Sequence, residues 1–361
     1  MRLVDGYLVL EPNVGGHRLA YVSLLCGATS EVQARWLTVV GAPGSAEAKE
    51  HLDTSIRANA VTRPPASRWV AAASNVARTD GVTHLVIPDG DVRLVEVLRA
   101  LPRLVLRRQT VSILLMRTGI SAGRGNALRL LMKRAIVRLL YLAPGIRIFQ
   151  LTDCFGVGRE IRRFRNALPL RDPILSKETG SNPVRHLMGD RSWVGVCGVI
   201  DPRKNVRLAI AAVAASDNLG LVLAGQLTPE ATADLANDGS VSYLAAEGRL
   251  LVHNRLLTDR ELNAVLADLK VILILHDNDY PSGIMGRAAV LGTPAVVPVG
   301  GWLARIVDRT GAGRSAELTP ESVLDAVQII MSNEVSFSSA TRRAMNGHSP
   351  DELPTALIGR G

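Results

Sequence analysis

Cysteines and aromatic residues are scarce in this sequence. The three cysteines stand far apart, at Cys26, Cys154 and Cys197, which excludes a disulfide framework and the close ligand spacing of zinc sites. Aromatic residues make up 4% of the chain, and none of them lies in a strand pattern typical of RNA-binding modules. We therefore expect no nucleic-acid partner.

Long apolar runs without charges are also missing. No such run reaches the roughly 18 residues that a membrane-spanning helix needs, and the first residues lack the order of a signal peptide. We therefore expect a cytoplasmic protein. Hydrophobic residues nevertheless make up 47% of the 361 residues, and charged residues 21%. This composition excludes a disordered chain and suffices for two domains.

The net charge of +9 is concentrated in one part of the chain. Residues 102–165 contain fourteen Lys or Arg and two acids, Asp153 and Glu160, a local net charge of +12 that leaves −3 for the remainder. This concentration indicates a local anionic partner.

Part of this basic window has a helical pattern in which cations alternate with leucines. The cations are Arg124, Lys133, Arg134 and Arg138. Such a helix suits an anionic membrane surface, so we predict that the 102–165 window attaches the protein peripherally to the inner face of a membrane. The alternative is an ordinary amphipathic core helix with one solvated face.

Apolar runs alternate with helical patterns along both halves of the chain. Runs at 3–10, 83–89 and 111–117 are each followed by a segment with helical periodicity, and the second half repeats the alternation from 193–199 and 271–275. This order predicts an α/β protein with two tandem Rossmann-like domains.

Proline and glycine mark the expected boundary between the domains. They cluster between Pro169 and Pro183, a composition typical of an exposed connection. We predict an N-terminal domain at 1–168, a linker at 169–190 and a C-terminal domain at 191–335. A polar tail with one short helix is predicted at 336–361.

Two segments of the second half have the composition of an anion site. The first, GVIDPRKN at 198–205, places Arg203 and Lys204 between a strand and a helix, where the N–H groups of the helix also attract anions. A solvated basic turn is the alternative.

The second segment follows the apolar run that ends at 275. Ser282 and Gly283 open a helix there, so the N–H groups of Gly283 and Ile284 are suited to phosphate oxygens, while Asp277 or Asp279 is suited to sugar hydroxyls. An ordinary connecting loop is the alternative.

In this order and spacing, the two segments resemble the donor domain of retaining GT-B glycosyltransferases. These are the group 1, or family 4-like, enzymes that include sucrose synthases and bacterial mannosyltransferases. The resemblance covers most of the second half, and the chain is similar to a divergent member. It implies two domains facing across a cleft, with the C-terminal domain binding the donor and the N-terminal domain on the acceptor side.

The resemblance also implies an activity. A hexose passes from a nucleotide diphosphate sugar to an acceptor hydroxyl of a glycan, a lipid-linked molecule or a small molecule, with retention of configuration. No cofactor is implied, and no metal, although residues 277–279 read Asp-Asn-Asp. The resemblance leaves two alternatives open: a non-catalytic GT-B scaffold or subunit, and a sugar-nucleotide epimerase.

Family residues for the donor map onto both segments. Gly198 and Lys204 match a glycine and a lysine that hold the diphosphate, and Val199 stands where the family has an arginine, so Arg203 is expected to compensate. Of two family glutamates that contact the donor sugar and the ribose, Asp279 replaces the first and Arg287 the second. Because a guanidinium has only donors, ribose recognition must differ at Arg287.

The first half carries a weaker resemblance. Gly15 and Gly16 look like the family's double-glycine loop, which approaches the diphosphate, and His17 and Arg18 follow on the acceptor side. A simple strand-to-helix turn is the alternative.

Two other strand ends of the first half supply further candidates. Arg117 stands where the family often has a histidine near the reacting sugar, so Arg117 and Asp279 are the catalytic candidates. Asp89 and Asp91 follow another strand and are candidates for the acceptor side. His84, inside that strand, is expected to be a buried histidine with hydrogen-bond partners.

Overall fold

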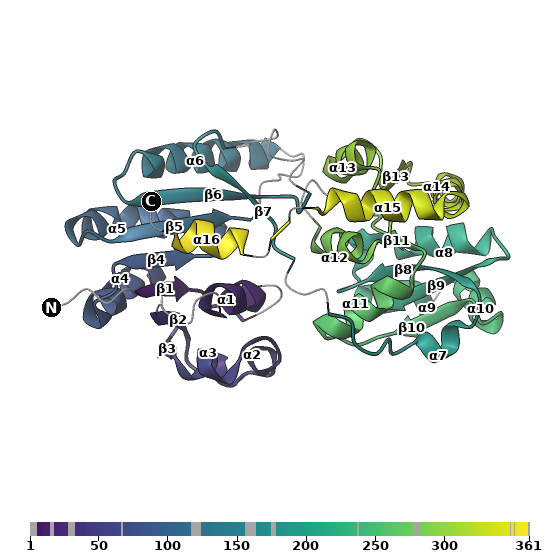
Figure 1. The fold of residues 1–361 in the computed structure, drawn as a ribbon, viewed down its shortest axis with the longest axis horizontal. Coiled ribbons are helices and arrows are strands. Elements are labelled where there is room, and N and C mark those ends of the chain that lie inside the picture. Colours follow the sequence, from purple (N-terminus) through teal and green to yellow (C-terminus); the bar gives the residue numbers. More distant parts are fainter. Residues whose placement is uncertain are drawn as a thin grey trace. The chain divides into compact units, whose positions relative to one another are not determined.

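The computed structural model describes most of the chain, as two compact α/β units (Figure 1). The N-terminal unit comprises 1–152, 159–175 and 349–361, and the C-terminal unit comprises 153–158 and 176–348. The residues described are 6–14, 18–27, 33–65, 68–116, 124–155, 164–174, 178–236, 238–276, 282–346, 348–349 and 351–359.

A parallel sheet of seven strands forms the centre of the N-terminal unit as described, in the order β3-β2-β1-β4-β5-β6-β7. The chain builds outward from β1 to β3 and then returns to start β4 on the other side of β1. The switch point of the sheet, where ligands of open α/β folds bind, therefore lies between β1 and β4. The strands are β1 (Gly6–Leu10), β2 (Gln33–Val39), β3 (Ala60–Arg63), β4 (His84–Ile87), β5 (Thr110–Leu115), β6 (Ile146–Thr152) and β7 (Leu168–Arg171).

Helices cover both faces of this sheet. One face packs against α4 (Trp69–Asp80), α5 (Leu94–Leu106) and α6 (Arg124–Tyr141). The other face packs against α1 (Arg18–Gly27), α2 (Ala46–His51), α3 (Thr54–Ala58) and α16 (Glu352–Ile358). Because the central strands are buried on both faces, they read in the sequence as continuous apolar runs. Two short 3-10 helices, η1 (Ala42–Gly44) and η2 (Gly90–Val92), complete this unit.

The C-terminal unit has a parallel sheet of six strands in its described part, in the order β10-β9-β8-β11-β12-β13. Its switch point lies between β8 and β11, which pair in parallel through Val194 and Val271. The strands are β8 (Ser192–Cys197), β9 (Leu219–Ala224), β10 (Leu250–His253), β11 (Val271–Leu273), β12 (Ala295–Pro298) and β13 (Gly313–Ala316).

The C-terminal unit also has helices on its sheet, and α8, α9, α10 and α14 share one core with the strands. The helices are α7 (Arg185–Met188), α8 (Val206–Ala214), α9 (Pro229–Ala236), α10 (Gly239–Ala246), α11 (Asp259–Asp268), α12 (Gly283–Leu291), α13 (Trp302–Thr310), α14 (Pro320–Ser332), α15 (Glu334–Ala344) and the 3-10 helix η4 (Pro202–Lys204).

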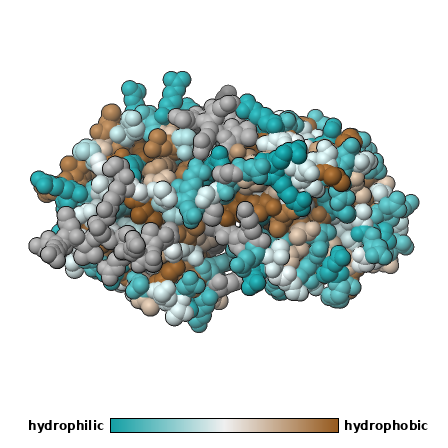
Figure 2. All heavy atoms as spheres, viewed as in Figure 1, coloured by the Kyte–Doolittle hydropathy of each residue, from teal (hydrophilic) through white to brown (hydrophobic). Residues whose placement is uncertain are grey.

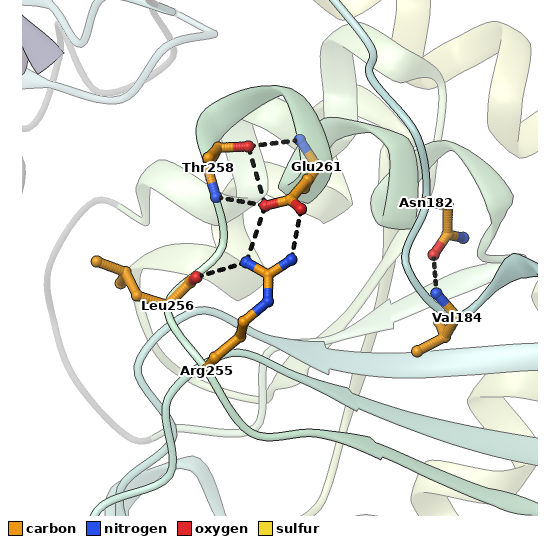
Figure 3. Close-up of polar contacts among 6 residues, drawn as sticks. All are labelled: Asn182, Val184, Arg255, Leu256, Thr258 and Glu261. Atoms are coloured by element: carbon orange, nitrogen blue, oxygen red, sulfur yellow. Dashed lines mark hydrogen bonds and ion pairs between the residues drawn. The ribbon is translucent and has the colours of Figure 1, made fainter. Parts of the chain in front are cut away.

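The start of α11 shows how local sequence fixes an element (Figure 3). Thr258 and Glu261 form a capping box, in which each side chain accepts a hydrogen bond from the other residue's backbone N–H. The Arg255 guanidinium donates to the Glu261 carboxylate from both terminal nitrogens. This hydrogen bonding is the main cause that lowers the pKa of Glu261 to about 2.

The predicted fold class is confirmed, but the end of the chain differs from the prediction. The polar tail forms two helices, and the second of them, α16, belongs to the N-terminal unit. Its Leu353 and Leu357 side chains are fully buried there. The predicted linker at 169–190 also contains part of β7, which pairs with β6. None of the described helices is long and apolar enough to cross a membrane.

Polar contacts hold α16 in place at the carbonyl of Leu357. Arg147 Nη2 donates to this oxygen at 3.1 Å, and His84 Nε2 bonds it at 3.0 Å. The other ring nitrogen of His84 bonds Thr110 Oγ1 at 3.0 Å. The expected hydrogen-bond partners of His84 are thus confirmed, whereas the residue is partly and not fully buried. Burial is the main cause that lowers the pKa of His84 to about 4.

We predict that Leu357→Ala lowers the free energy of unfolding of the N-terminal unit by about 2–5 kcal/mol, because it leaves a cavity in the core. Urea denaturation followed by tryptophan fluorescence measures this change. Thr355→Ala, at an exposed position of the same helix, is the control and should change stability by less than about 0.5 kcal/mol. Equal effects of the two variants would contradict the packing of α16 described above.

Candidate functional site

The ends of β8 and β11 lie at the switch point of the C-terminal sheet. Gly198 follows β8, while Leu275 and His276 follow β11. The Asn205 side chain joins the two strand ends, because its Nδ2 donates to the Leu275 carbonyl at 2.7 Å. This edge of the sheet is where an open α/β fold binds its ligand.

The turn after β8 brings two cations to this edge. Asp201 accepts a hydrogen bond from Arg203 N at 3.1 Å and pairs with the Arg203 guanidinium at 2.5 Å, while the Arg203 side chain remains 78% exposed. The Lys204 ammonium is partly buried and donates to the Cys197 carbonyl. Its burial lowers the pKa of Lys204. An ammonium held in this way gains stabilisation from a bound anion.

Gly198 leaves space where the Lys204 ammonium and the Ile284 side chain both approach the backbone. Its φ of 88° lies in the left-handed region. A Cβ at this position would lie 3.3 Å from Lys204 Nζ and 3.4 Å from Ile284 Cδ1. Two segments that the sequence suggested separately, at 198–205 and at 282–284, therefore meet at one place.

The beginning of α12 adds hydrogen-bond donors to this place. Ser282 is the N-cap of the helix, and its Oγ accepts a hydrogen bond from Met285 N at 3.4 Å. The first N–H groups of a helix have no partner within the helix. Those of Gly283 and Ile284 are therefore suited to the same anion as Lys204.

His276 belongs to this site but was not among the predicted residues. Burial lowers its pKa to about 4, and the charges of Lys204 and Arg203 act in the same direction. His276 is therefore neutral at physiological pH. The signal in the sequence was its position directly after the apolar run of β11, at a strand end. Asp277 and Asp279, which follow it, lie outside the described residues.

Arg287 is engaged with the neighbouring helix α11. Its Nη2 pairs with Asp259 Oδ1 at 2.7 Å and its Nη1 donates to Asn263 Oδ1 at 3.4 Å. Asp259 is the first residue of α11, next to the capping box of Figure 3. These contacts show what holds Arg287, and its contact with the donor stays a prediction.

The switch point of the N-terminal sheet joins two of the residues predicted for the acceptor side. Arg18, at the start of α1, donates from Nε to Asp89 Oδ2 at 2.9 Å, and its Nη2 lies 2.9 Å from the same oxygen. Asp89 follows β4 and is 3% exposed. Its other oxygen, Oδ1, is buried and has no hydrogen-bond partner among the described residues.

Asp91 has structural partners in the same unit. It accepts a hydrogen bond from Met116 N at 2.7 Å and forms an ion pair with Lys133. Lys133 also lies over the Phe164 ring, 5.1 Å from its centre. Lys133 is thus turned inward from α6, whereas the sequence placed it with the exposed cations of this helix. The other candidates of the N-terminal half, Gly15, Gly16, His17 and Arg117, lie outside the described residues.

Glu11 is a buried acid that was not among the predicted site residues. It follows β1, next to the switch point, and is 1% exposed. Burial is the main cause that raises the pKa of Glu11 to about 7. A hydrogen bond from Asn13 N lowers this pKa, the charge of Asp89 raises it, and the charge of Arg18 lowers it. A carboxyl that titrates near neutral pH is suited to proton transfer.

Known structures share this fold along the whole chain. A sucrose-phosphate synthase from Thermosynechococcus elongatus is 14% identical, with a TM-score of 0.68 over 98% of this chain and 97% of that one. HepE from Anabaena, solved in complex with UDP, is 12% identical with a TM-score of 0.67 over 98% and 95%. WaaG, a glycosyltransferase involved in lipopolysaccharide biosynthesis, is 11% identical with a TM-score of 0.61 over 98% and 100%.

The predicted GT-B fold is thereby confirmed. The same fold also includes a putative UDP-N-acetylglucosamine 2-epimerase from Listeria monocytogenes, 8% identical with a TM-score of 0.63 over 98% of this chain and 95% of that one. No protein-family profile and no curated protein sequence matches the chain. The function therefore depends on the chemistry of the two sites and not on the fold alone.

We predict that Glu11→Gln stabilises the N-terminal unit at alkaline pH. Because its pKa is raised in the folded state, the neutral Glu11 carboxyl contributes fully to stability below pH 4.5. This contribution is lost as the pH rises through about 7 and the buried carboxyl becomes charged. The variant should therefore gain about 3 kcal/mol over the wild type at pH 8.5 and less than about 1 kcal/mol at pH 5. Urea denaturation at both pH values measures the difference, with Glu47→Gln, at an exposed position, as control. A gain independent of pH would show that Glu11 titrates normally.

Proposed function

We propose that the chain is a glycosyltransferase that moves a hexose from a nucleotide diphosphate sugar to an acceptor hydroxyl. The observation that carries this proposal is that the Lys204 ammonium and the Ile284 side chain at the beginning of α12 both approach Gly198, at the switch point between β8 and β11. An ammonium and free helix N–H groups are the groups that a departing diphosphate needs. HepE, which shares the fold, has been solved with UDP-glucose, and this supports a nucleotide sugar as the donor.

In the proposed reaction, the bond between the sugar C1 and the diphosphate oxygen breaks, and its electron pair stays on the diphosphate. The acceptor oxygen forms the new bond to C1, and its proton passes to the leaving phosphate. Lys204 and Arg203 neutralise the charge that grows on the diphosphate, so the proposal includes transfer without a divalent metal. Retention of configuration follows the sequence resemblance, and NMR of the product's anomeric proton tests it.

The proposal places a glycan or lipid-linked acceptor at the N-terminal unit. The exposed surface of α6 supports a membrane as the place of attachment. Leu131 and Met132 are 61% and 57% exposed, and Arg134 and Arg138 are exposed on the same helix. Figure 2 shows apolar side chains among polar ones over the part of the N-terminal unit where α6 lies. Exposed leucines next to arginines fit an anionic bilayer surface.

A sugar-nucleotide epimerase is the second candidate function. Epimerases share the fold, and Glu11 supplies a carboxyl whose pKa of about 7 is suited to proton transfer. Incubation of UDP-N-acetylglucosamine without any acceptor distinguishes the two, because only an epimerase inverts a ring carbon of the sugar under these conditions. Failure to bind any nucleotide sugar would favour the remaining alternative, a non-catalytic GT-B scaffold.

We predict that Lys204→Ala weakens the binding of UDP by about tenfold or more, because it removes a charged hydrogen-bond donor from the diphosphate. Isothermal titration calorimetry measures the affinity. Arg207→Ala removes an exposed cation of α8 in the same unit and should leave the affinity unchanged. Unaltered UDP binding by the Lys204 variant would overturn the diphosphate role, and loss of transfer on adding a chelator would overturn metal independence.

We predict that Leu131→Asp lowers the fraction of protein that co-sediments with phosphatidylglycerol vesicles, because it places a carboxylate in the apolar surface of α6. High salt should lower the fraction as well. Leu187→Asp, at a position 55% exposed in the C-terminal unit, is the matched control. If the fraction that co-sediments does not depend on anionic lipid, on salt or on the Leu131 substitution, attachment through α6 is refuted.

A further inference from the structure

The groove between α4 and α5 of the N-terminal unit contains a cavity of about 480 Å³. It lies on helices and is separate from the strand ends described above. Three arginines dominate its lining, with one carboxylate and three small or apolar residues. The lining residues are Arg68, Ala71, Glu96, Arg99, Ala100, Pro102 and Arg103.

Glu96 already has partners that neutralise it. Its Oε1 accepts a hydrogen bond from Arg93 Nη1 at 2.5 Å, as part of an ion pair. Its Oε2 accepts from Val70 N at 3.2 Å, at the start of α4. Glu96 therefore fixes α4 against α5 and leaves the cations of the cavity uncompensated.

The three arginines of the lining have no ion-pair partner within the described ranges of the chain. Arg99 and Arg103 are one turn apart on α5, and Arg68 precedes α4 on the opposite wall. The neighbourhood is crowded with positive charge. The pKa of Arg107 is lowered, first by desolvation and then by the charges of Arg78 and Arg103.

Space for a ligand exists because the helices face each other through small side chains. Ala71 and Ala100 line the cavity from α4 and α5, and a longer side chain at either position would occupy it. The geometry therefore combines an open volume with three guanidinium groups. A carboxylate offers two oxygens, which one arginine can bind fully, whereas a phosphate offers further oxygens and a second charge for the others.

We propose that this cavity is a binding site for a phosphate group, either on a soluble molecule or on the head group of an anionic lipid. Arg99 and Arg103 hold the phosphate from α5, and Arg68 holds it from the opposite wall. The site is independent of the proposed donor site, which lies in the other unit.

The test uses the full chain with the donor site weakened by Lys204→Ala and the α6 surface weakened by Leu131→Asp, so that neither pyrophosphate bound at the donor site nor vesicles bound through α6 mask the new site. Inorganic pyrophosphate is titrated by calorimetry. Flotation with phosphatidylcholine vesicles, with and without phosphatidic acid, tests the lipid source. We expect binding in at least one of the two experiments, and the experiment that shows binding identifies the source of the phosphate. Binding in neither experiment overturns the proposal.

Three further variants distinguish the contribution of the arginine charges to binding from that of the free volume of the cavity. Arg99→Ala with Arg103→Ala should weaken binding by about tenfold or more. Ala71→Met, which keeps every charge, should weaken it because the side chain fills the cavity. Arg63→Ala, at an exposed position of β3 outside the cavity, should have no effect. Circular dichroism checks that each variant is folded.

Dependence of binding on both the arginines and the free volume supports the site. If the double arginine variant binds pyrophosphate and vesicles as tightly as its parent, the proposal is overturned. It is also overturned if Arg63→Ala weakens binding as much as the double variant, since the effect is then one of net charge. Neither result bears on the glycosyltransferase proposal, which UDP binding to the unmodified chain tests separately.

Discussion

Parallel strand pairing is the constraint on which both sites depend. When every strand of a sheet points the same way, all strand ends with their following loops gather at one edge. In each unit the chain then builds outward from its first strand, β1 or β8, in one direction and returns to build in the other. The loops that follow the two strands at this reversal, β1 and β4 or β8 and β11, therefore lead away from each other and leave a crevice between them. Lys204 and Asn205 occupy one crevice, and Glu11 and Asp89 occupy the other.

Both crevices contain ionisable groups whose environment disfavours their charged form. Burial lowers the pKa of Lys204 and of His276 in the C-terminal unit and raises the pKa of Glu11 in the N-terminal unit. Burial of such groups in their charged form lowers the stability of the protein. Binding of a ligand of opposite charge, or a change in protonation, would offset this cost. The two sites differ in chemistry, since one presents the cations Arg203 and Lys204 and the other holds the carboxyls of Glu11 and Asp89.

The strands and helices next to the sites could be predicted because their patterns are strong. β8 and β9 are buried on both faces and read as apolar runs, and Lys204 stands visibly between such a run and a helix. β13 reads Gly-Arg-Ser-Ala and α16 is a short helix in a polar tail, so neither has a pattern that stands out from a loop. Only the tertiary structure shows that β13 pairs with β12 and that α16 buries Leu353 and Leu357.

Single residues of the sites likewise differ in whether the local sequence reveals them. Arg203 and Lys204 were found because two adjacent cations at a helix start are unusual. Glu11 was missed because a glutamate before a proline reads as a surface turn, and its burial comes from elements far along the chain. His276 was missed for the same reason, since the cations that face it precede it by about seventy residues.

The position of α16 also bears on how the protein is made. The N-terminal unit buries Leu353 and Leu357 in its core and binds the Leu357 carbonyl through Arg147 and His84. Because α16 is translated after the C-terminal unit, the apolar surface that it covers on the N-terminal unit stays exposed during synthesis until that unit has been translated. The unit translated first is the last to be completed, so a ribosome that stalls within the second unit releases a chain with an open core and a risk of aggregation.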